Sequence, residues 1–375
     1  METDVYHKLR KHLDQMPVPF PATRSGIEIE LLKCLFTEDE AIIACETSAF
    51  PETPEKIHSR VKDKFSLEEV REKLKSMAEK GAILERLSDR KSKKLYHKIP
   101  LAVGMFEFQV NHLSKRFSEL FNAYQEEAFF NELISMKTQQ MRTIPVNVAI
   151  EHQFVVGNYD DIRKIVDGSP GPFALMNCVC RQSQDLLEDP CHLTQHRETC
   201  ITMEKSARHM IRRGVAREIT RKELFRFLTE FKKIGLVLQP ENTQHPSFIC
   251  CCCGCCCAIL KQAARYDKPA RFIHSNFRTV VNARHCDGCE KCMERCQMAA
   301  IIKADGHVEI LEERCIGCGV CIPVCKPHAM KLVKKEKELV PPADDHELYK
   351  RMLVERFGLS RTVGMAAKSL VGMKV

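Results

Sequence analysis

Eight cysteines near the C-terminus carry the clearest chemistry in this sequence, because their spacing is repeated. Residues 286–296 and 315–325 each follow the pattern C-x2-C-x2-C-x3-C. Three closely spaced thiolates wrap one [4Fe–4S] cluster, while the fourth cysteine of each run reaches the other cluster. The predicted ligands of the first cluster are Cys286, Cys289, Cys292 and Cys325, and those of the second are Cys315, Cys318, Cys321 and Cys296.

A disulfide framework and zinc knuckles are the alternatives for these runs, but a zinc site needs four ligands and no interleaved fourth cysteine. The stretch resembles the two-cluster ferredoxin domain of bacteria over roughly residues 276–332. This resemblance implies a ferredoxin-like fold that transfers electrons. Gln297 departs from the family, which usually has proline after the fourth cysteine, whereas Pro327 follows the second run. The departure loosens one turn but removes no ligand.

A second group of cysteines lies in the middle of the chain, with four in residues 178–200 and seven in residues 250–257. Cys250, Cys253 and Cys256 repeat the C-x2-C-x2-C spacing of a loop that wraps a cubane. Neighbouring side chains of an extended chain point in opposite directions, so one cluster cannot take all seven thiols. We predict that the two segments lie side by side and hold one or two further iron–sulfur clusters, with zinc as the alternative metal. The predicted ligands are Cys178, Cys180, Cys191, Cys200, Cys250, Cys252, Cys253, Cys255, Cys256 and Cys257.

Three other residues near the first segment could contribute to this site. Arg181 is predicted to place a cation or an N–H donor beside a cluster, which would raise its reduction potential. His192 and His196 are predicted to be solvated loop residues rather than ligands.

The middle of the chain also carries a resemblance. A C-x-C-R block, an Ile-Cys-rich run and a ferredoxin pair follow one another over roughly residues 140–330, as in a family of uncharacterised bacterial and archaeal iron–sulfur proteins. That family usually has asparagine where this chain has Cys251, so Cys251 is left out of the predicted ligands. The triplet Cys252-Cys253-Gly254 resembles the CCG modules of heterodisulfide reductases, although their long flanking spacings are not evident. The resemblance implies cofactor content rather than a reaction.

The composition fits a globular protein that keeps its thiols reduced. The chain has 375 residues, of which 44% are hydrophobic and 29% are charged. Neither a run of 18 apolar residues nor an apolar N-terminal segment is present. We therefore expect no transmembrane helix, and we expect a cytoplasmic location. In a reducing compartment, 21 cysteines indicate metal or redox chemistry. A net charge of +8 is mild over this length and fits an ordinary solvated surface.

The N-terminal part shows several short helices followed by a hairpin. Ser66 and Glu69 form a capping box that opens a helix to about Lys80, and two alternating runs follow at residues 82–87 and 94–99. This plan resembles the winged-helix domains of small bacterial regulators over roughly residues 25–102. The candidate recognition helix has equal numbers of acidic and basic residues, which favours protein interaction over DNA binding. The hairpin tip is nevertheless basic, with Arg90, Lys91, Lys93 and Lys94.

We therefore expect an α+β protein with a winged-helix-like N-terminal domain, a mixed α/β cysteine-rich middle domain and a two-cluster ferredoxin-like C-terminal domain. The expected boundaries are 1–24 for an N-terminal helix and linker, 25–103 for the winged-helix-like domain, 104–140 for a connecting helix, 141–270 for the cysteine-rich domain, 271–335 for the ferredoxin domain and 336–375 for a C-terminal helix and tail.

Three functions are compatible with these features. The leading hypothesis is an oxygen-sensitive electron-transfer protein that relays electrons to or from a partner oxidoreductase in anaerobic metabolism. The second is a redox-sensing transcriptional regulator whose winged helix reads DNA. The third is an oxidoreductase with a substrate-binding cluster at residues 250–257. The sequence contains no nucleotide-binding glycine loop, which argues against self-contained NAD(P)H chemistry.

Overall fold

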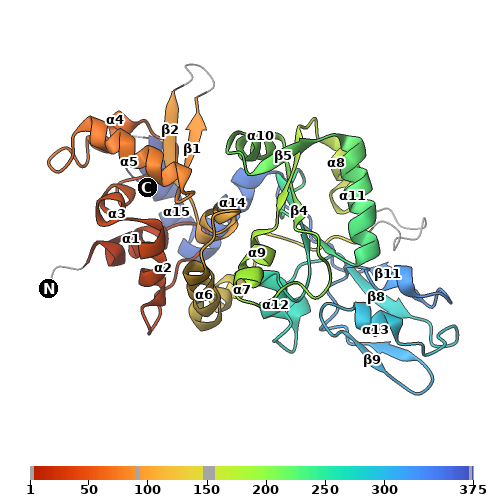
Figure 1. Cartoon of the computed structure of the whole chain (residues 1–375). Helices are drawn as coiled ribbons and strands as arrows, with labels where there is room; N and C mark the ends of the chain where they lie inside the picture. The colour runs from red at the N-terminus through yellow and green to blue at the C-terminus, as the bar shows by residue number, and fades with distance from the viewer. Residues whose placement is uncertain (1–3, 89–92, 147–156, 371–373, 375) are drawn as a thin grey trace. The chain divides into compact units, whose positions relative to one another are not determined.

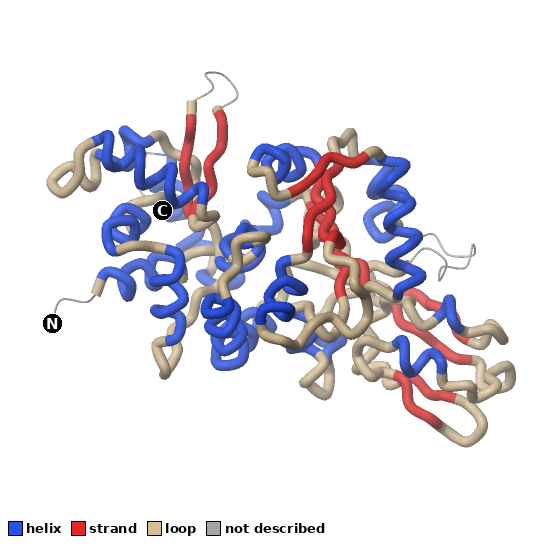
Figure 2. Tube along the Cα trace, in the orientation of Figure 1, coloured by secondary structure: helices blue, strands red, loops and turns tan. Residues whose placement is uncertain are grey.

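The computed structural model describes residues 4–88, 93–146, 157–370 and 374. The chain divides into two compact units. The N-terminal unit comprises residues 1–138 and 349–375, and the cysteine-rich unit comprises residues 139–348. In the part of the chain that the structure describes, no helix is both long and apolar enough to span a bilayer. Figures 1 and 2 show the helices and strands of each unit.

Short capped helices and one hairpin build most of the N-terminal unit. Thr37 and Ser66 each form a capping box, with Glu40 and Glu69 respectively, and Thr53 caps a helix that begins with Pro54. The helices are α1 (Val5–Leu13), α2 (Ile27–Leu35), α3 (Glu38–Ala44), α4 (Pro54–His58) and α5 (Leu67–Glu79), and the antiparallel hairpin is β1 (Ile83–Leu87) with β2 (Lys94–Lys98). This is the predicted order of elements, and the winged-helix assignment itself stays a prediction.

Acidic partners compensate the basic residues of α5. Arg71 bonds Glu55 at 2.8 Å, and Lys73 bonds Asp39 at 2.9 Å. Lys75 and Lys80 pair with Glu79 and Glu40 respectively. Basic side chains paired in this way offer little net charge to phosphates. At the hairpin, Arg90 and Lys91 lie outside the described residues.

The helix expected from residue 104 begins eleven residues later. Ser114 caps α6 (Lys115–Tyr124), which continues through η3 (Gln125–Phe129) into α7 (Phe130–Ser135). Residues 101–109 form two irregular turns, η1 (Leu101–Met105) and η2 (Glu107–Gln109). Phe106 nevertheless stacks on Phe121 with ring centroids 3.7 Å apart. The helical part of residues 104–140 therefore begins at Lys115, and the apolar residues before it pack in the core from irregular turns.

The C-terminal segment contributes to the same unit. Helix α14 (Asp345–Phe357) leads into α15 (Leu359–Leu370). Arg356 of α14 donates to the Asp14 carboxylate at 2.9 Å, and Thr138 donates to Glu355. These bonds hold the end of α14 against the N-terminal helices.

A five-stranded antiparallel sheet organises the first part of the cysteine-rich unit. Its strand order is β5-β3-β4-β7-β6. The strands are β3 (Phe173–Asn177), β4 (Glu198–Met203), β5 (Ala216–Ile219), β6 (Val237–Pro240) and β7 (Phe248–Cys252), and the helices are α8 (Ile162–Gly168), α9 (Val179–Leu186), α10 (Glu204–Arg212), α11 (Arg221–Ile234) and α12 (Ala258–Ala263). The sheet brings together two predicted ligands, because β4 and β7 pair Cys200 with Cys250.

The ferredoxin runs follow in the same unit, on short elements at the lower right of Figure 1. Strands β8 (Phe277–Val281) and β11 (Met330–Lys334) pair antiparallel, as do β9 (Ile301–Lys303) and β10 (Val308–Ile310). Helix α13 (Lys291–Arg295) and the turn η7 (Ile322–Val324) each end next to the fourth cysteine of a run. The two halves have the same order of parts, as the repeated spacing requires.

Candidate metal centres

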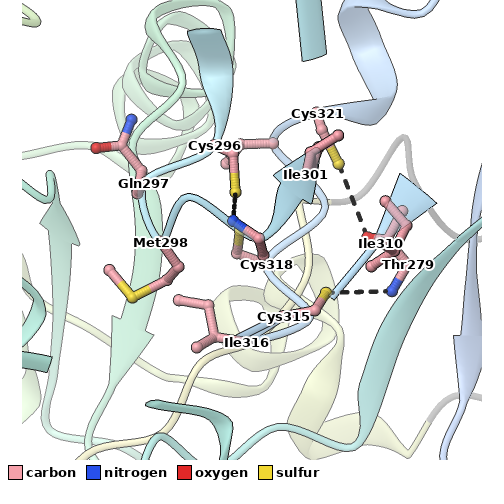
Figure 3. Close-up of a pocket in the computed structure, with 12 residues that line it drawn as sticks. Thr279, Cys296, Gln297, Met298, Ile301, Ile310, Cys315, Ile316, Cys318 and Cys321 are labelled. Atoms are coloured by element: carbon pink, nitrogen blue, oxygen red, sulfur yellow. Dashed lines mark hydrogen bonds between the residues drawn. The ribbon is translucent and has the colours of Figure 1, made fainter. Parts of the chain in front are cut away.

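One pocket collects the second predicted set of ferredoxin ligands. Cys315, Cys318 and Cys321 line it together with Cys296, which comes from the other run (Figure 3). The remaining walls are mostly apolar, with Met298, Ala300, Ile301, Ile310, Ile316 and Val320. A pocket that brings four thiols together among mostly apolar walls suits a thiolate-bound iron–sulfur cluster.

Nearby hydrogen-bond donors point at these sulfurs. The Ala300 amide donates to Cys296 Sγ at 3.2 Å, and the Thr279 amide donates to Cys315 Sγ at 3.4 Å. The Thr279 hydroxyl lies 3.7 Å from Cys321 Sγ, as Figure 3 shows. Donors to ligand sulfur stabilise the more negative, reduced state of a cluster and so raise its potential.

The first predicted ligand set also comes together. Burial, and then the neighbouring thiols of Cys325, Cys286 and Cys289, raise the pKa of the Cys292 thiol to about 11. Cys292 and Cys321 share one hydrophobic core with Ile301, Val308 and Met330. The two ligand sets therefore adjoin through this core, which gives electrons a short path between them.

Glycine is required where the second run passes under β8. Gly317 has a φ of +64°, and a Cβ there would overlap the Phe277 carbonyl and come within 2.7 Å of Ser275 Oγ. A side chain would push the loop between Cys315 and Cys318 away from the strand. Gly306, in the turn between β9 and β10, has a similar φ of +70° but has open space beside it.

In the middle of the chain, strand β7 sorts the consecutive cysteines onto two faces. Side chains alternate along a strand, so Cys250 and Cys252 share one face while Cys251 lies on the other. Beyond the strand, residues 253–257 turn into α12, which begins after Cys257. This geometry divides the run into two separate thiol groups.

The first of these, the four-cysteine group, consists of Cys191, Cys253, Cys255 and Cys256, whose sulfurs all lie within 4.8 Å of one another. Cys191 Sγ lies 3.7 Å from Cys253 Sγ and 3.8 Å from Cys255 Sγ. Cys255 Sγ lies 3.6 Å from Cys256 Sγ. Three of the four residues are buried. Cys191, which is 62 residues from Cys253 in the sequence, is therefore placed to bind one metal centre together with the other three thiols.

The second group has six thiols, which hydrogen-bond one after another and whose two end members, Cys178 and Cys200, interact electrostatically. We call it the six-thiol ring, and its order is Cys178, Cys180, Cys257, Cys252, Cys250 and Cys200. These bonds raise the pKa of the donors Cys180, Cys252 and Cys200. They lower the pKa of the acceptors Cys178, Cys257 and Cys250. Because the pKa shifts alternate in direction along this series, Cys178, Cys257 and Cys250 are favoured as thiolates, the form that binds metal.

Arg181 lies between the two thiol groups and is fully buried. Its guanidinium donates to Cys253 Sγ and to the Cys251 carbonyl, each at 3.3 Å, and to the Thr199 hydroxyl. Burial lowers the pKa of Arg181, but the negative charge of the neighbouring Cys178 and Cys253 sulfurs raises it by more, so the pKa stays above its usual value. A permanent positive charge therefore offsets part of the thiolate charge.

The remaining predictions for this region concern residues beside the groups. His192 and His196 are largely exposed, and they pair with Asp189 and Glu230 respectively. Cys251 takes part in neither group, and burial raises the pKa of its thiol. The separation of the two groups could not be foreseen from spacing, because it depends on where β7 ends.

Gln297 has a contact that the sequence did not reveal. Its side-chain oxygen accepts a hydrogen bond from the Gly254 amide at 2.7 Å. A Cβ on Gly254 would lie 2.7 Å from the Gln297 carbonyl oxygen. The residue after Cys296 therefore packs directly on the turn between Cys253 and Cys255. The only indication of this contact in the sequence is that Gln297 stands where related ferredoxin domains usually have proline.

We expect Gly317→Ala to lose about four iron atoms per chain, because its Cβ displaces the loop that carries the second ligand set. Gly306→Ala is the matched control, since it introduces the same strain at positive φ, about 1–2 kcal/mol, without a steric overlap. Iron and acid-labile sulfide analysis after anaerobic purification measures the difference. Equal iron content in the two variants would show that the loop does not need Gly317.

Comparison with known proteins supports the C-terminal part of this picture. A family model described as a 4Fe-4S dicluster domain matches residues 278–326. Electron transport protein HydN of Escherichia coli K12 is 36% identical over 58 residues, which are 16% of this chain and 33% of HydN. A component of an ion-translocating oxidoreductase complex from Methanosarcina acetivorans is 38% identical over 47 residues, which are 12% of this chain and 18% of that protein.

This similarity is local. The chain spans a third or less of these curated relatives, and no solved structure matches it. What the comparisons establish is a ferredoxin-like 4Fe-4S dicluster domain at residues 278–326, next to which the structure places two further groups of thiols.

Proposed function

We propose that the protein is an iron–sulfur electron carrier that relays electrons to or from a partner oxidoreductase in anaerobic metabolism. The observation that supports this most directly is the adjoining pair of ligand sets in the dicluster domain, joined through the core of Cys292 and Cys321. Proteins with this local similarity include HydN, whose name describes electron transport. The partner and the anaerobic setting are part of the proposal.

The six-thiol ring is proposed to hold a third iron–sulfur cluster. Cys178, Cys257 and Cys250 are each separated by an intervening thiol, which suits thiolates that bind three different iron corners of a cubane, and another thiol of the group would bind the fourth. Arg181 faces Cys178 of this ring and counters its negative charge. The third cluster would then exchange electrons with the dicluster domain, which lies in the same compact unit.

The N-terminal unit is proposed to select the partner protein. Its helices and hairpin follow a winged-helix-like order, and the basic residues of α5 are engaged by acidic neighbours. This pairing favours a protein surface over DNA as the target of the unit. A reducing compartment such as the cytoplasm is proposed as the setting, because the proposed clusters need thiolate ligands that are kept reduced.

The electron-carrier proposal predicts that anaerobic protein titrated with dithionite takes up about three electrons per chain, one for each cluster. Cys180→Ser, which breaks the six-thiol ring, should lower this to about two and remove about four iron atoms. EPR-monitored titration and iron analysis make the measurement, with Cys251→Ala as the control within the same region. Uptake below two electrons by the wild-type chain would contradict the proposal.

One observation favours an oxidoreductase instead. Three of the six thiols, Cys178, Cys257 and Cys250, are favoured as thiolates, whereas a cubane has four iron corners, and a substrate-binding cluster at residues 250–257 is one of the hypotheses from the sequence. If one iron keeps an open position, cyanide or carbon monoxide should shift the EPR signal that Cys180→Ser removes. An unchanged signal in the presence of both probes would leave electron transfer as the function of the ring.

A further inference from the structure

We propose that Cys191, Cys253, Cys255 and Cys256 bind a single four-coordinate zinc ion rather than an iron–sulfur cubane. This inference concerns a different thiol group from the six-thiol ring and does not depend on electron transfer. It rests on the spacing of the sulfurs, on the charge beside them and on the contact that the turn makes with Gln297.

The spacing of the sulfurs matches one small ion. Zinc binds thiolate sulfur at about 2.3 Å in tetrahedral geometry, which places the sulfurs about 3.8 Å from one another. Three pairs of sulfurs in this group lie 3.6, 3.7 and 3.8 Å apart. In a cubane each thiolate binds a different iron corner, so its sulfurs lie much farther apart.

The dicluster domain provides an internal comparison. Among the residues that the structure describes, the four-cysteine group is the one whose ligand atoms lie within 4.8 Å of each other. The sulfurs of the predicted ferredoxin ligands, which line a separate pocket and core, do not lie this close together. The same chain therefore presents two kinds of cysteine site, one wide and one tight.

The surrounding charge also suits zinc. Four thiolates around one Zn²⁺ leave a net charge of −2, and burying that charge requires compensation. Arg181, fully buried, donates to Cys253 Sγ at 3.3 Å and supplies one positive charge. An N–H donor to a ligand sulfur is the usual support around such a centre.

The ion would have a structural role. It joins Cys191 to a turn 62 residues away and fixes the backbone between Cys253 and Cys255. The Gly254 amide in that turn donates a hydrogen bond to the Gln297 side chain at 2.7 Å. Gln297 directly follows Cys296, a predicted cluster ligand. We infer that the zinc-bound turn positions the dicluster domain against the cysteine-rich sheet.

The test is elemental analysis of the full chain purified anaerobically from medium with added zinc. Wild-type protein should contain about one zinc per chain, and Cys255→Ser should lose it while keeping its iron. Cys180→Ser should show the reverse, with iron lost and zinc kept. Cys251→Ala, a buried cysteine of the same run outside both groups, should keep both metals.

Zinc X-ray absorption on the wild-type chain gives a second measurement that needs no variant. Four sulfur neighbours at about 2.3 Å are expected. Nitrogen or oxygen neighbours bound directly to the zinc would mean adventitious zinc and would overturn the proposal. Loss of about four iron atoms from Cys255→Ser, with zinc absent from the wild type, would assign a cubane to this group instead.

Discussion

The alternation of side chains along β7 is the constraint on which the metal chemistry of the middle region depends. Cys250 and Cys252 project from one face of the strand, and Cys251 projects from the other. The strand ends at Cys252, so the next cysteines leave the sheet in a turn and meet Cys191. Six of the seven cysteines at residues 250–257 thereby serve two groups, and a longer or shorter strand would mix them.

Burial of so many thiolates would be unfavourable without partners, and the structure supplies partners in three ways. In the six-thiol ring, donors and acceptors alternate. Beside the four-cysteine group, a buried guanidinium donates to sulfur. In the dicluster domain, backbone amides such as that of Ala300 point at the ligands. These partners also set how strongly each site holds negative charge, which is the property that tunes a redox centre.

The sequence predicted the dicluster domain well because its ligands are local. Three of every four cysteines lie within seven residues of one another, so spacing alone encodes the loop. For the middle region the sequence could predict only a set of possible ligands. The pairing of Cys200 with Cys250 depends on strand register, and the contact of Cys191 with Cys253 depends on where β7 ends. The start of the connecting helix could not be predicted for a related reason, because Phe106 packs on Phe121 from an irregular turn before Ser114 starts the helix.

The bond between Gln297 and Gly254 also changes how separable the ferredoxin segment is. By its motif the segment looks like a portable module that could be cut out and expressed alone. Excision would leave the Gln297 side chain without its amide partner and would expose to water the flank of the chain beside Cys296. Solvent exposure shifts the potential of a cluster. The reduction potentials measured on such a fragment would therefore differ from those of the whole chain.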